Sequence, residues 1–423
     1  MTSPARDDYS LDTNRTPPRY LGDHYQRTGT CFRIFAQPRF VRFFRTPVAI
    51  YLPAPAGTIG AGPSDRDIRT VDALDKRPYY DPDRNTERVP PYRGPRAPAA
   101  RPHRGHFAHL HPSGATARQF SAAQVYATIR FTLTVWEHYL GGPVRWYFRR
   151  QFPQLEVIPR IDSGTAYSRP GYIECGYERG GSRRRRYPLG ENFDVVAHET
   201  GHLIQRSVIG DPGHVEGLEQ RAREEAFADL VAIIALLHVR PAVARLLDRT
   251  RGNLFSANLL SRIGEMSQTT VARRANNAKR IDTLGWNPDP RAFRYELAAP
   301  FTGAGYDALV DLYERILVRR RAIPHALAEA SYDASGKKIP QIQRAFELTY
   351  RARPAVFEDA LLEARDVFAS VLAQTWRRMS PYDGYPETVA TMLAVAREQH
   401  GASTQRILRE AFAWRGIAPG TSP

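Results

Sequence analysis

Two histidines four positions apart, in a segment with helical apolar spacing, constrain this 423-residue chain more than any other feature of its sequence. The segment ENFDVVAHETGHLIQRSVIG contains His198, Glu199 and His202, and its apolar spacing predicts a helix that ends near Gly210. Positions i and i+4 share one face of a helix, so both imidazoles can reach one zinc ion while Glu199 approaches the attacking water as a general base. Catalytic zinc needs a third protein ligand and an open fourth position, so the fold must bring a further ligand to this helix.

Two known routes supply that third ligand. One continues the helix into a Gly turn and a third histidine, but Gln205 stands at the Gly position and Val208 at the histidine position, which excludes it. The other brings a glutamate from a second helix. The segment GLEQRAREEAFADLVAIIALLHV is predicted to be a helix, and it carries Glu224 and Glu225.

Glu225 is the better candidate of the two. Asp229 lies four residues after it on the same face, where it can orient a histidine ligand through the ring nitrogen that does not bind zinc. Glu224 has only Ala228 at that offset. A helix otherwise built of apolar residues would not bury two carboxylates without a cation to neutralise them. The sequence therefore predicts one zinc ion per chain, held by His198, His202 and Glu225.

Changes in composition and apolar spacing along the chain indicate an α+β protein in three parts. Residues 1–104 are dense in Arg, Pro, Asp and Tyr and are expected to form a largely extended or disordered leader, so a chain starting near Arg104 should fold. Within the leader, CFRIFAQPRFVRFFRTPVAIYL could form a strand pair that folds against the main body. Residues 105–212 read as a strand-containing half with the HExxH helix: SAAQVYATIRFTLTVWEHYLG predicts a helix, and LEVIPRID and GYIECGYE predict strands. Residues 213–423 read as a helical half with the third ligand, so the site is expected in the cleft between the halves.

Charge and cysteine content narrow the setting. The formal net charge of +16 comes mostly from arginine and favours an anionic partner if the charge is clustered, whereas the basic loop GGSRRRRYPLG reads first as a solvated turn. Cys31 and Cys175 are too few for a disulfide framework and are expected to stay unlinked. With neither a secretory signal nor an apolar run long enough for a membrane span, we expect a cytoplasmic protein, or one exported without a classical signal peptide.

The segments VVAHETGHLI and EEAFADLVA resemble the paired metal helices of the thermolysin-like metallopeptidases, the gluzincins. The resemblance extends from about Phe107 to Ile417. It implies a mixed sheet plus helices in the amino-terminal half, an all-helical carboxy-terminal half, and zinc-dependent hydrolysis of peptide bonds. Carried over by position, it gives the same ligands and base, Asp229 as the histidine's partner, and Thr165 with Ala166 as part of the edge that binds substrate.

Two departures from the family pattern affect the chemistry. Family members place a histidine in the helical half to stabilise the oxyanion, but no histidine occurs between His238 and His325. The matching position looks like Tyr295, whose phenol can donate a hydrogen bond but carries no positive charge. Asp194 matches an acid that helps to hold calcium in the family, yet the helix after Asp229 lacks companion carboxylates, so calcium is not expected.

Two functional hypotheses remain open. The first is a zinc endopeptidase acting on peptide or protein substrates, with Tyr295 steadying the oxyanion. The second is a catalytically weak or inactive scaffold, stabilised by zinc, that binds protein or nucleic-acid partners. A scaffold has no need of a base aimed at the fourth metal position, so the intact Glu199 favours the enzyme.

Overall fold

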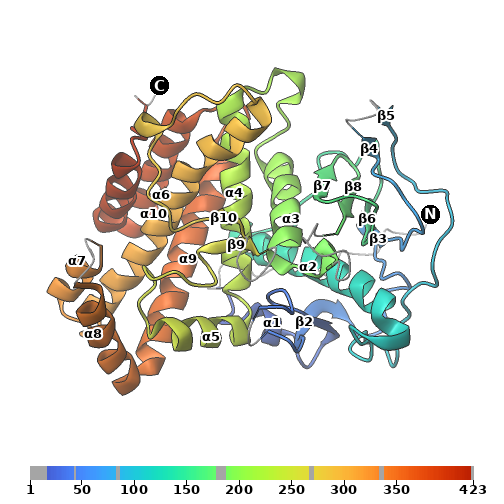
Figure 1. Cartoon of the computed structure of the whole chain (residues 1–423), viewed down its shortest axis with the longest axis horizontal. Helices are drawn as coiled ribbons and strands as arrows, with labels where there is room; N and C mark the ends of the chain where they lie inside the picture. Colours follow the sequence, from blue (N-terminus) through green and yellow to red (C-terminus); the bar gives the residue numbers. More distant parts are fainter. Residues whose placement is uncertain are drawn as a thin grey trace, which may run out of the picture.

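The computed structural model describes residues 17–41, 44–81, 86–177, 187–265, 271–332 and 338–420. Within these residues, small sheets lie beside a large set of helices, which confirms the mixed α+β prediction (Figure 1). The strands are β1 (Gly29–Ile34), β2 (Val48–Pro55), β3 (Ile68–Thr70), β4 (Tyr80–Asp81), β5 (Thr86–Glu87), β6 (Leu155–Ile158), β7 (Ala166–Arg169), β8 (Tyr172–Cys175), β9 (Arg262–Glu265) and β10 (Val271–Arg274).

Long helices carry most of the core. The α-helices are α1 (Leu21–His24), α2 (Ala117–Leu140), α3 (Phe193–Val208), α4 (Leu218–Leu236), α5 (Arg240–Thr250), α6 (Pro290–Arg319), α7 (His325–Tyr332), α8 (Ile339–Ala352), α9 (Pro354–Arg378) and α10 (Tyr385–Trp414). Short 3-10 turns are η1 (Gly114–Thr116), η2 (Leu189–Glu191), η3 (Gly213–Val215) and η4 (Ile281–Thr283). In Figure 1, α3 and α4 stand between the strands β6 to β8 and the bundle of α6, α9 and α10.

The four-stranded sheet has the order β3-β6-β8-β7. Strands β3, β6 and β8 run parallel, whereas β7 pairs antiparallel with β8 and forms an edge of the sheet. Side chains alternate across the sheet, so Val157 and Ile173 join the main core while Ile158 and Tyr172 join a smaller cluster on the opposite face. This arrangement places the edge strand β7 against α3.

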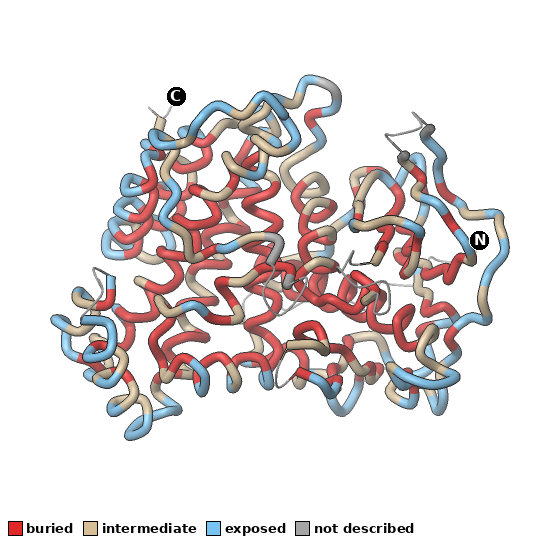
Figure 2. Tube along the Cα trace, viewed as in Figure 1, coloured by how far each residue is buried: buried red, intermediate tan, exposed pale blue. Residues whose placement is uncertain are grey.

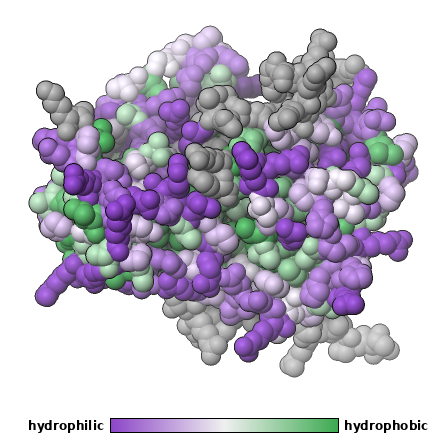
Figure 3. All heavy atoms as spheres, turned by 60° about the horizontal axis from the view of Figure 1, so that its bottom comes forward, coloured by the Kyte–Doolittle hydropathy of each residue, from purple (hydrophilic) through white to green (hydrophobic). Residues whose placement is uncertain are grey.

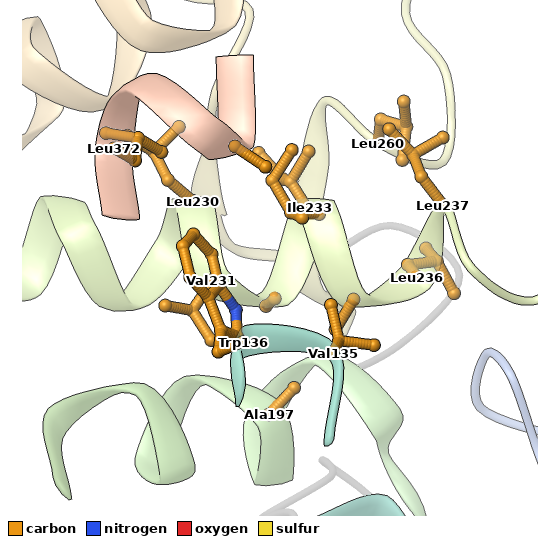
Figure 4. Packing of buried hydrophobic residues seen from close by; sticks show 14 of the residues in the cluster. Val135, Trp136, Ala197, Leu230, Val231, Ile233, Leu236, Leu237, Leu260 and Leu372 are labelled. Carbon is orange, nitrogen blue, oxygen red and sulfur yellow. The ribbon is translucent and has the colours of Figure 1, made fainter. Parts of the chain in front are cut away.

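Helix α2 is the central pillar, because almost every position of it is buried. It ends at Gly141, whose φ of 69° is left-handed, as expected for a glycine that closes a helix. The predicted helix through this segment is confirmed. Trp136 of α2, Val231 of α4 and Ala197 of α3 belong to the same buried cluster (Figure 4), and the Trp136 ring stacks on Trp376 of α9 with 4.4 Å between ring centroids.

The HExxH helix α3 packs unusually close to α4 at one glycine. A Cβ atom on Gly201 would lie 3.0 Å from Ala228 Cα and 3.0 Å from Val231 Cβ. That spacing is tighter than ordinary packing allows, so a larger residue would push the two helices apart. The glycine within the motif therefore sets the distance between the helix that carries both histidines and the helix that carries Glu225.

The region expected to be a leader is instead part of the core for the described residues. The predicted strand pair forms as β1 and β2, and its inward residues Phe32, Ile34, Ile50 and Leu52 are at most 1% exposed. The short strand β3 pairs directly with β6. Figure 2 shows the buried parts of these strands, which precede α2 in the chain. A domain boundary at residue 104 does not match this packing. The apolar residues of β1 and β2 alternate with polar ones and are buried on the side that faces α2.

The second half is mainly helical, but not entirely so. Strands β9 and β10 form an antiparallel hairpin between α5 and α6, which corrects the expectation of an all-helical half. The hairpin contacts α3, α4 and α6. It therefore brings residues from beyond position 260 to the HExxH helix.

The surface and the cysteines raise few surprises. Hydrophilic residues cover most of the described surface visible in Figure 3, with hydrophobic residues in small separate groups. Among the described helices, none alone is long and apolar enough to cross a membrane; α4 and α5 pass such a test only as a pair bent by 96°. Cys31 and Cys175 are unlinked, as predicted. Residues 180–186 of the basic loop lie outside the described residues.

Glu137, near the end of α2, is expected to make stability depend on pH. The residue is 4% exposed, and burial raises the pKa of its carboxyl from 4.5 to about 7, with the charge of Arg130 opposing the shift. Because the folded-state pKa lies above the unfolded one, the contribution of Glu137 is complete below the unfolded value and is lost as the pH rises through the folded value. The stability lost between the two values amounts to about 3 kcal/mol at most.

Glu137→Gln tests this effect, because the amide can still accept the hydrogen bond from Val144 N but does not titrate. We expect the variant to be more stable than the parent at pH 8 by up to about 3 kcal/mol, and nearly as stable at pH 5. Urea unfolding of both proteins at the two pH values measures the difference. Equal differences at pH 5 and pH 8 would contradict the assignment.

Candidate metal centre

Helix α3 presents both histidines of the motif on its buried face. Its first turn is capped by Asn192, whose side chain accepts a hydrogen bond from Val195 N. One helical turn separates His198 from His202, and their Nε2 atoms face each other at 3.1 Å. Both imidazoles therefore aim at the same point, as the spacing in the sequence predicted.

Glu225 of α4 completes a three-residue cluster. Its Oε2 lies 3.3 Å from His198 Nε2 and 3.7 Å from His202 Nε2, and no other group of three such residues is found within the described ranges. Ligands bound tetrahedrally at about 2.0–2.1 Å lie roughly 3.3–3.4 Å apart, which is close to these separations. The Oε2 atom is also buried without a hydrogen-bond partner among the described residues. The cluster thus fits a divalent metal ion, and the two-imidazole, one-carboxylate donor set suits zinc.

The electrostatics of the cluster favour a positive charge at its centre. Burial alone would raise the pKa of Glu225, but the close contact with His198 and the charges of His202, His198 and Arg273 lower it to about 2. Burial would lower the pKa of His202, yet its hydrogen bond to Glu224 and the charges of Glu225 and Glu224 raise it to about 9. The carboxylates therefore hold a proton on this imidazole, at a position where a bound cation would replace it.

Each histidine has its own carboxylate partner on α4. Asp229 Oδ1 lies 2.9 Å from His198 Nδ1, the contact expected from the four-residue offset from Glu225. Glu224 Oε1 lies 3.0 Å from His202 Nδ1, and both Glu224 oxygens accept hydrogen bonds from Arg206. Sequence reasoning dismissed Glu224 because it sought a partner on the same helix face, whereas the contact crosses from α4 to α3. Carboxylates in this position fix the ring and raise its basicity.

Glu224 is expected to tune metal affinity without being a ligand. Glu224→Ala removes the partner of His202, and loss of such a contact weakens metal binding by roughly 10- to 100-fold. Glu224→Gln keeps an acceptor but no charge, so its metal affinity should lie between those of Glu224→Ala and the parent. Glu225→Ala is the comparison, because it deletes a ligand and should abolish stoichiometric zinc. Competition with a chromogenic chelator measures all three, and an unchanged affinity in Glu224→Ala would remove Glu224 from the site.

Glu199 lies on the same helix beside the cluster and is only partly buried. Its Oε2 accepts a 2.6 Å hydrogen bond from the Ser168 hydroxyl on the edge strand β7. The helix therefore supplies the candidate base, and the sheet edge holds it in place. Ser168 was not predicted, although it lies two residues after Ala166 and so on the same face of the strand.

Thr165 and Ala166 lie at the start of β7, the edge to which the sequence assigned substrate binding. Thr165 Oγ1 donates to the carbonyl of Ala166, and the Thr165 carbonyl accepts from Gly176 N of the neighbouring chain segment. The Ala166 side chain packs into the main core. The structure thus places Ala166 in the edge strand and Thr165 directly before it, while Ser168 is the one whose side chain reaches Glu199.

Tyr295 lies in the second turn of α6, between two arginines. Its hydroxyl accepts a 2.8 Å hydrogen bond from Arg294 Nη2, and the guanidinium carbons of Arg294 and Arg273 lie 4.6 and 5.5 Å from its ring centroid. Arg294 Nε lies 3.2 Å from Glu225 Oε1. Tyr295 is 39% exposed. Arg294 therefore links Tyr295 to the third candidate ligand, and the tyrosine is partly open to solvent.

Arg273 of β10 also reaches the cluster, and no sequence signal pointed to it. Its Nε donates to Asp229 Oδ1 at 2.7 Å, and its Nη2 lies 3.0 Å from His198 Nδ1 and 3.2 Å from His198 Nε2. The residue is 75 positions from His198 in sequence, on a hairpin that the helical reading of the second half missed. Only its packing against α3 and α4 reveals the contact.

Asp194, the residue that matches a calcium-holding acid, is engaged by the region before α2. Gln37 Nε2 donates to Asp194 Oδ1 at 3.1 Å and to Oδ2 at 3.0 Å, and both residues are buried. The contact ties the first turn of α3 to the segment after β1. Asp194 therefore helps to position the metal helix from its amino-terminal end.

Comparisons with known proteins add one structural likeness. No protein-family model matches the chain, and no curated protein matches it. Among solved structures, the precursor of protealysin, a metalloproteinase from Serratia proteamaculans, is similar with a TM-score of 0.46 and 11% sequence identity, over 87% of this chain and 92% of that one. Similarity at this level establishes neither a family nor an activity for this chain.

Proposed function

We propose that this protein is a zinc-dependent peptidase that hydrolyses peptide bonds with Glu199 as general base. The observation that carries the proposal is the convergence of His198, His202 and Glu225 on one point, with Glu199 beside them on the same helix. A purely structural metal site needs four protein ligands, whereas this cluster offers three and leaves one position open among the described residues.

The residues around the cluster would then each have a distinct part in the reaction. Zinc bound there supplies a Lewis acid that polarises the scissile carbonyl and acidifies water. Glu199 takes the proton from the attacking water and returns it to the leaving amine. Ser168 holds the Glu199 carboxylate through its hydroxyl, so the base is oriented before substrate arrives. Asp229 and Glu224 keep the two imidazoles turned toward the cluster.

The edge of the sheet supports a peptide as the substrate. Strand β7 pairs with β8 on one side and is the last strand of its sheet in the described chain. An extended peptide can add to such an edge through its backbone, which recognises length and direction rather than side chains. Thr165 and Ala166 would lie along this added strand, and the scissile bond would pass the Ser168–Glu199 pair. An internal segment can bind in this way, which favours an endopeptidase.

Tyr295 is proposed as a donor to the oxyanion in place of the missing histidine. Its oxygen accepts from Arg294, so its own proton remains available to donate. Tyr295→Phe removes only the hydroxyl, and loss of one such donor costs roughly 100- to 1,000-fold in turnover. We expect the lower end of this range, because zinc shares the charge. Kinetics with zinc-loaded protein measure the effect, and an unchanged kcat with unchanged zinc content would exclude this role.

The alternative is a zinc-stabilised scaffold that binds protein or nucleic-acid partners through arginines. It would explain the ligand cluster and the charge of +16 but not the carboxylate of Glu199 held beside the open position. Cleavage of a peptide library by the purified chain, with and without a chelator, separates the two. We expect cleavage that the chelator stops and about one equivalent of zinc restores. Folded, zinc-loaded protein that cleaves no peptide would favour the scaffold.

A further inference from the structure

Two guanidinium groups form one wall of the candidate metal centre. Arg273 reaches it from β10 and Arg294 from the beginning of α6, and both lie close to the ring of Tyr295. Their side chains are 22% and 29% exposed, so they are neither sealed in the core nor fully solvated. Glu199 and Ser168 approach the cluster from α3 and β7 instead. A substrate bound along the edge of β7 would therefore meet Glu199 and Ser168 from α3 and β7, and the two arginines from β10 and α6.

Each arginine contacts the site through Nε and Nη2 and keeps Nη1 as a further donor. Arg273 Nε donates to Asp229, and Arg294 Nε lies 3.2 Å from Glu225 Oε1. Arg294 Nη2 donates to Tyr295. Within the described residues, no hydrogen bond is made by Nη1 of either side chain, although a guanidinium has five N–H donors. The contacts with Asp229 and Glu225 orient both guanidinium groups, and Nη1 of each remains available to donate to another acceptor.

Metal binding would free a further donor. In the structure Arg273 Nη2 lies 3.0 Å from His198 Nδ1 and 3.2 Å from His198 Nε2, the atom that faces His202 and Glu225. With a cation on Nε2, the ring proton would lie on Nδ1 and point to Asp229, so neither nitrogen could accept a hydrogen bond from the guanidinium. Arg273 would keep its contact with Asp229 and turn Nη2 to another acceptor. The same event that activates the site therefore leaves this arginine short of a partner.

The two arginines beside Tyr295 have fewer acidic partners than the third arginine of the site. Among the described residues, Arg273 and Arg294 are each matched by one carboxylate, Asp229 and Glu225 respectively. Arg206 instead pairs with Glu224, Glu216 and Asp211. A cation held by Glu225 would share the charge that this carboxylate offers to Arg294, and a partly buried, unmatched guanidinium is costly. A carboxylate of the substrate would match it, whereas a neutral peptide segment would not.

We propose that Arg273 and Arg294 bind a carboxylate of the substrate, so that the site selects peptides carrying such a group beside the scissile bond. This inference rests on the proposed peptidase function and names its substrate class. Arginine pairs with carboxylates through two parallel hydrogen bonds, which gives direction as well as strength. The carboxylate comes either from the carboxyl terminus of a short peptide or from an Asp or Glu side chain. In both cases its recognition determines specificity, and the bond cleavage itself is unchanged.

Matched peptides distinguish these sources. One peptide is compared as free acid and as carboxy-terminal amide, and a second, amidated peptide is compared with Glu or Gln next to the cleaved bond. Binding is measured by calorimetry to zinc-loaded Glu199→Gln protein, and kcat/KM is measured with the parent. We expect the carboxylate form of one pair to bind and react roughly 10- to 100-fold better than its neutral counterpart. Equal binding and equal rates within both pairs would overturn the proposal.

Arginine variants then locate the contact. Arg294→Gln should cancel the preference, which is taken as the ratio between the two peptides of a pair on the same zinc-loaded protein, because Arg294 also contacts Glu225 and Tyr295. Arg294→Lys keeps the charge but not the planar pair of donors, so it should retain part of the preference. It replaces the glutamine variant in the test if that variant does not fold. Arg274→Gln is the matched control, because this exposed neighbour of Arg273 lies on the other face of β10 and should leave the preference intact. A preference that survives both Arg294 variants would also overturn the proposal.

The outcomes separate this inference from the function on which it rests. Peptides that bind with a carboxylate preference but are never cleaved would refute the peptidase and leave the carboxylate site standing. Peptides cleaved at the same rate with or without a carboxylate would refute the specificity and leave the peptidase standing.

Discussion

Replacing Glu199 with Gln is expected to lower kcat for peptide cleavage by about 100- to 10,000-fold, the range contributed by a positioned general base. The amide has nearly the same shape as the carboxylate and can still accept the hydrogen bond from Ser168, but it cannot take a proton from water. Glu199 is not one of the three residues whose donor atoms converge, so zinc content should stay the same as in the parent. Single-turnover cleavage and metal analysis of the same preparation measure both quantities.

Ser168→Ala provides the graded control for this experiment. It removes the hydroxyl that orients Glu199 and leaves the carboxylate in place, so we expect a loss of about tenfold, the typical contribution of one hydrogen bond to a charged group. Parental rates in Glu199→Gln would mean that the base is another residue. Loss of zinc in that variant would mean that Glu199 supports the metal instead.

The local parts of the site could be predicted because they follow from helical periodicity. The histidines lie one turn apart on α3, and Asp229 lies one turn after Glu225 on α4, so a single helix geometry predicts each pair. The need for a small residue at position 201, by contrast, is visible only in the fold, where α4 lies against Gly201. Helices α2 and α3 and strands β6 and β8 were recognisable for the same reason, since their apolar residues recur with a regular period.

The contacts between distant elements could not be predicted in this way. Arg273 reaches His198 from a pair of short strands that lie in a region expected to be helical throughout. Arg294 was not predicted, although this neighbour of Tyr295 is the residue that lies against Glu225. In each case the tertiary fold, and no periodic pattern, brings the charge to the metal cluster. A single sequence contains no signal for such a pairing.

The region before residue 104 was misread for a related reason. Its many arginines and prolines lower the mean hydropathy, but the fold uses a few well-spaced apolar residues and leaves the polar ones outside. Phe32 stacks on Phe107 with 4.8 Å between ring centroids, and Gln124 accepts a hydrogen bond from Phe35 N. Composition averages over this alternation, whereas burial depends on it. The predicted strand pair was the correct signal within a region otherwise read as unstructured.

Deleting residues 1–104 is therefore expected to prevent folding, the reverse of the outcome that composition suggested. The side chains that the deletion removes include six that are each at most 1% exposed: Phe32, Ile34, Phe35, Ile50, Leu52 and Ile68. Burial of such a side chain contributes about 1.5–3 kcal/mol, so together they supply roughly 9–18 kcal/mol. Net stabilities of folded proteins are about 5–15 kcal/mol, so most proteins could not absorb this loss.

The same deletion also takes away hydrogen bonds that hold the metal helix and α2. Gln37 would no longer hold Asp194 in the first turn of α3, and Asp65 would no longer accept from Tyr126 and Arg130 of α2. We expect a chain starting at Gly105 to aggregate or to lack a cooperative unfolding transition, and to bind no stoichiometric zinc. The matched control starts at Pro17 and keeps all of these hydrogen bonds, so it should unfold cooperatively. Circular dichroism during thermal unfolding and metal analysis compare the two chains. A chain from Gly105 that stays monomeric, unfolds cooperatively and binds zinc would show that β1 to β3 add little to the core, because the helices would then suffice to hold the site.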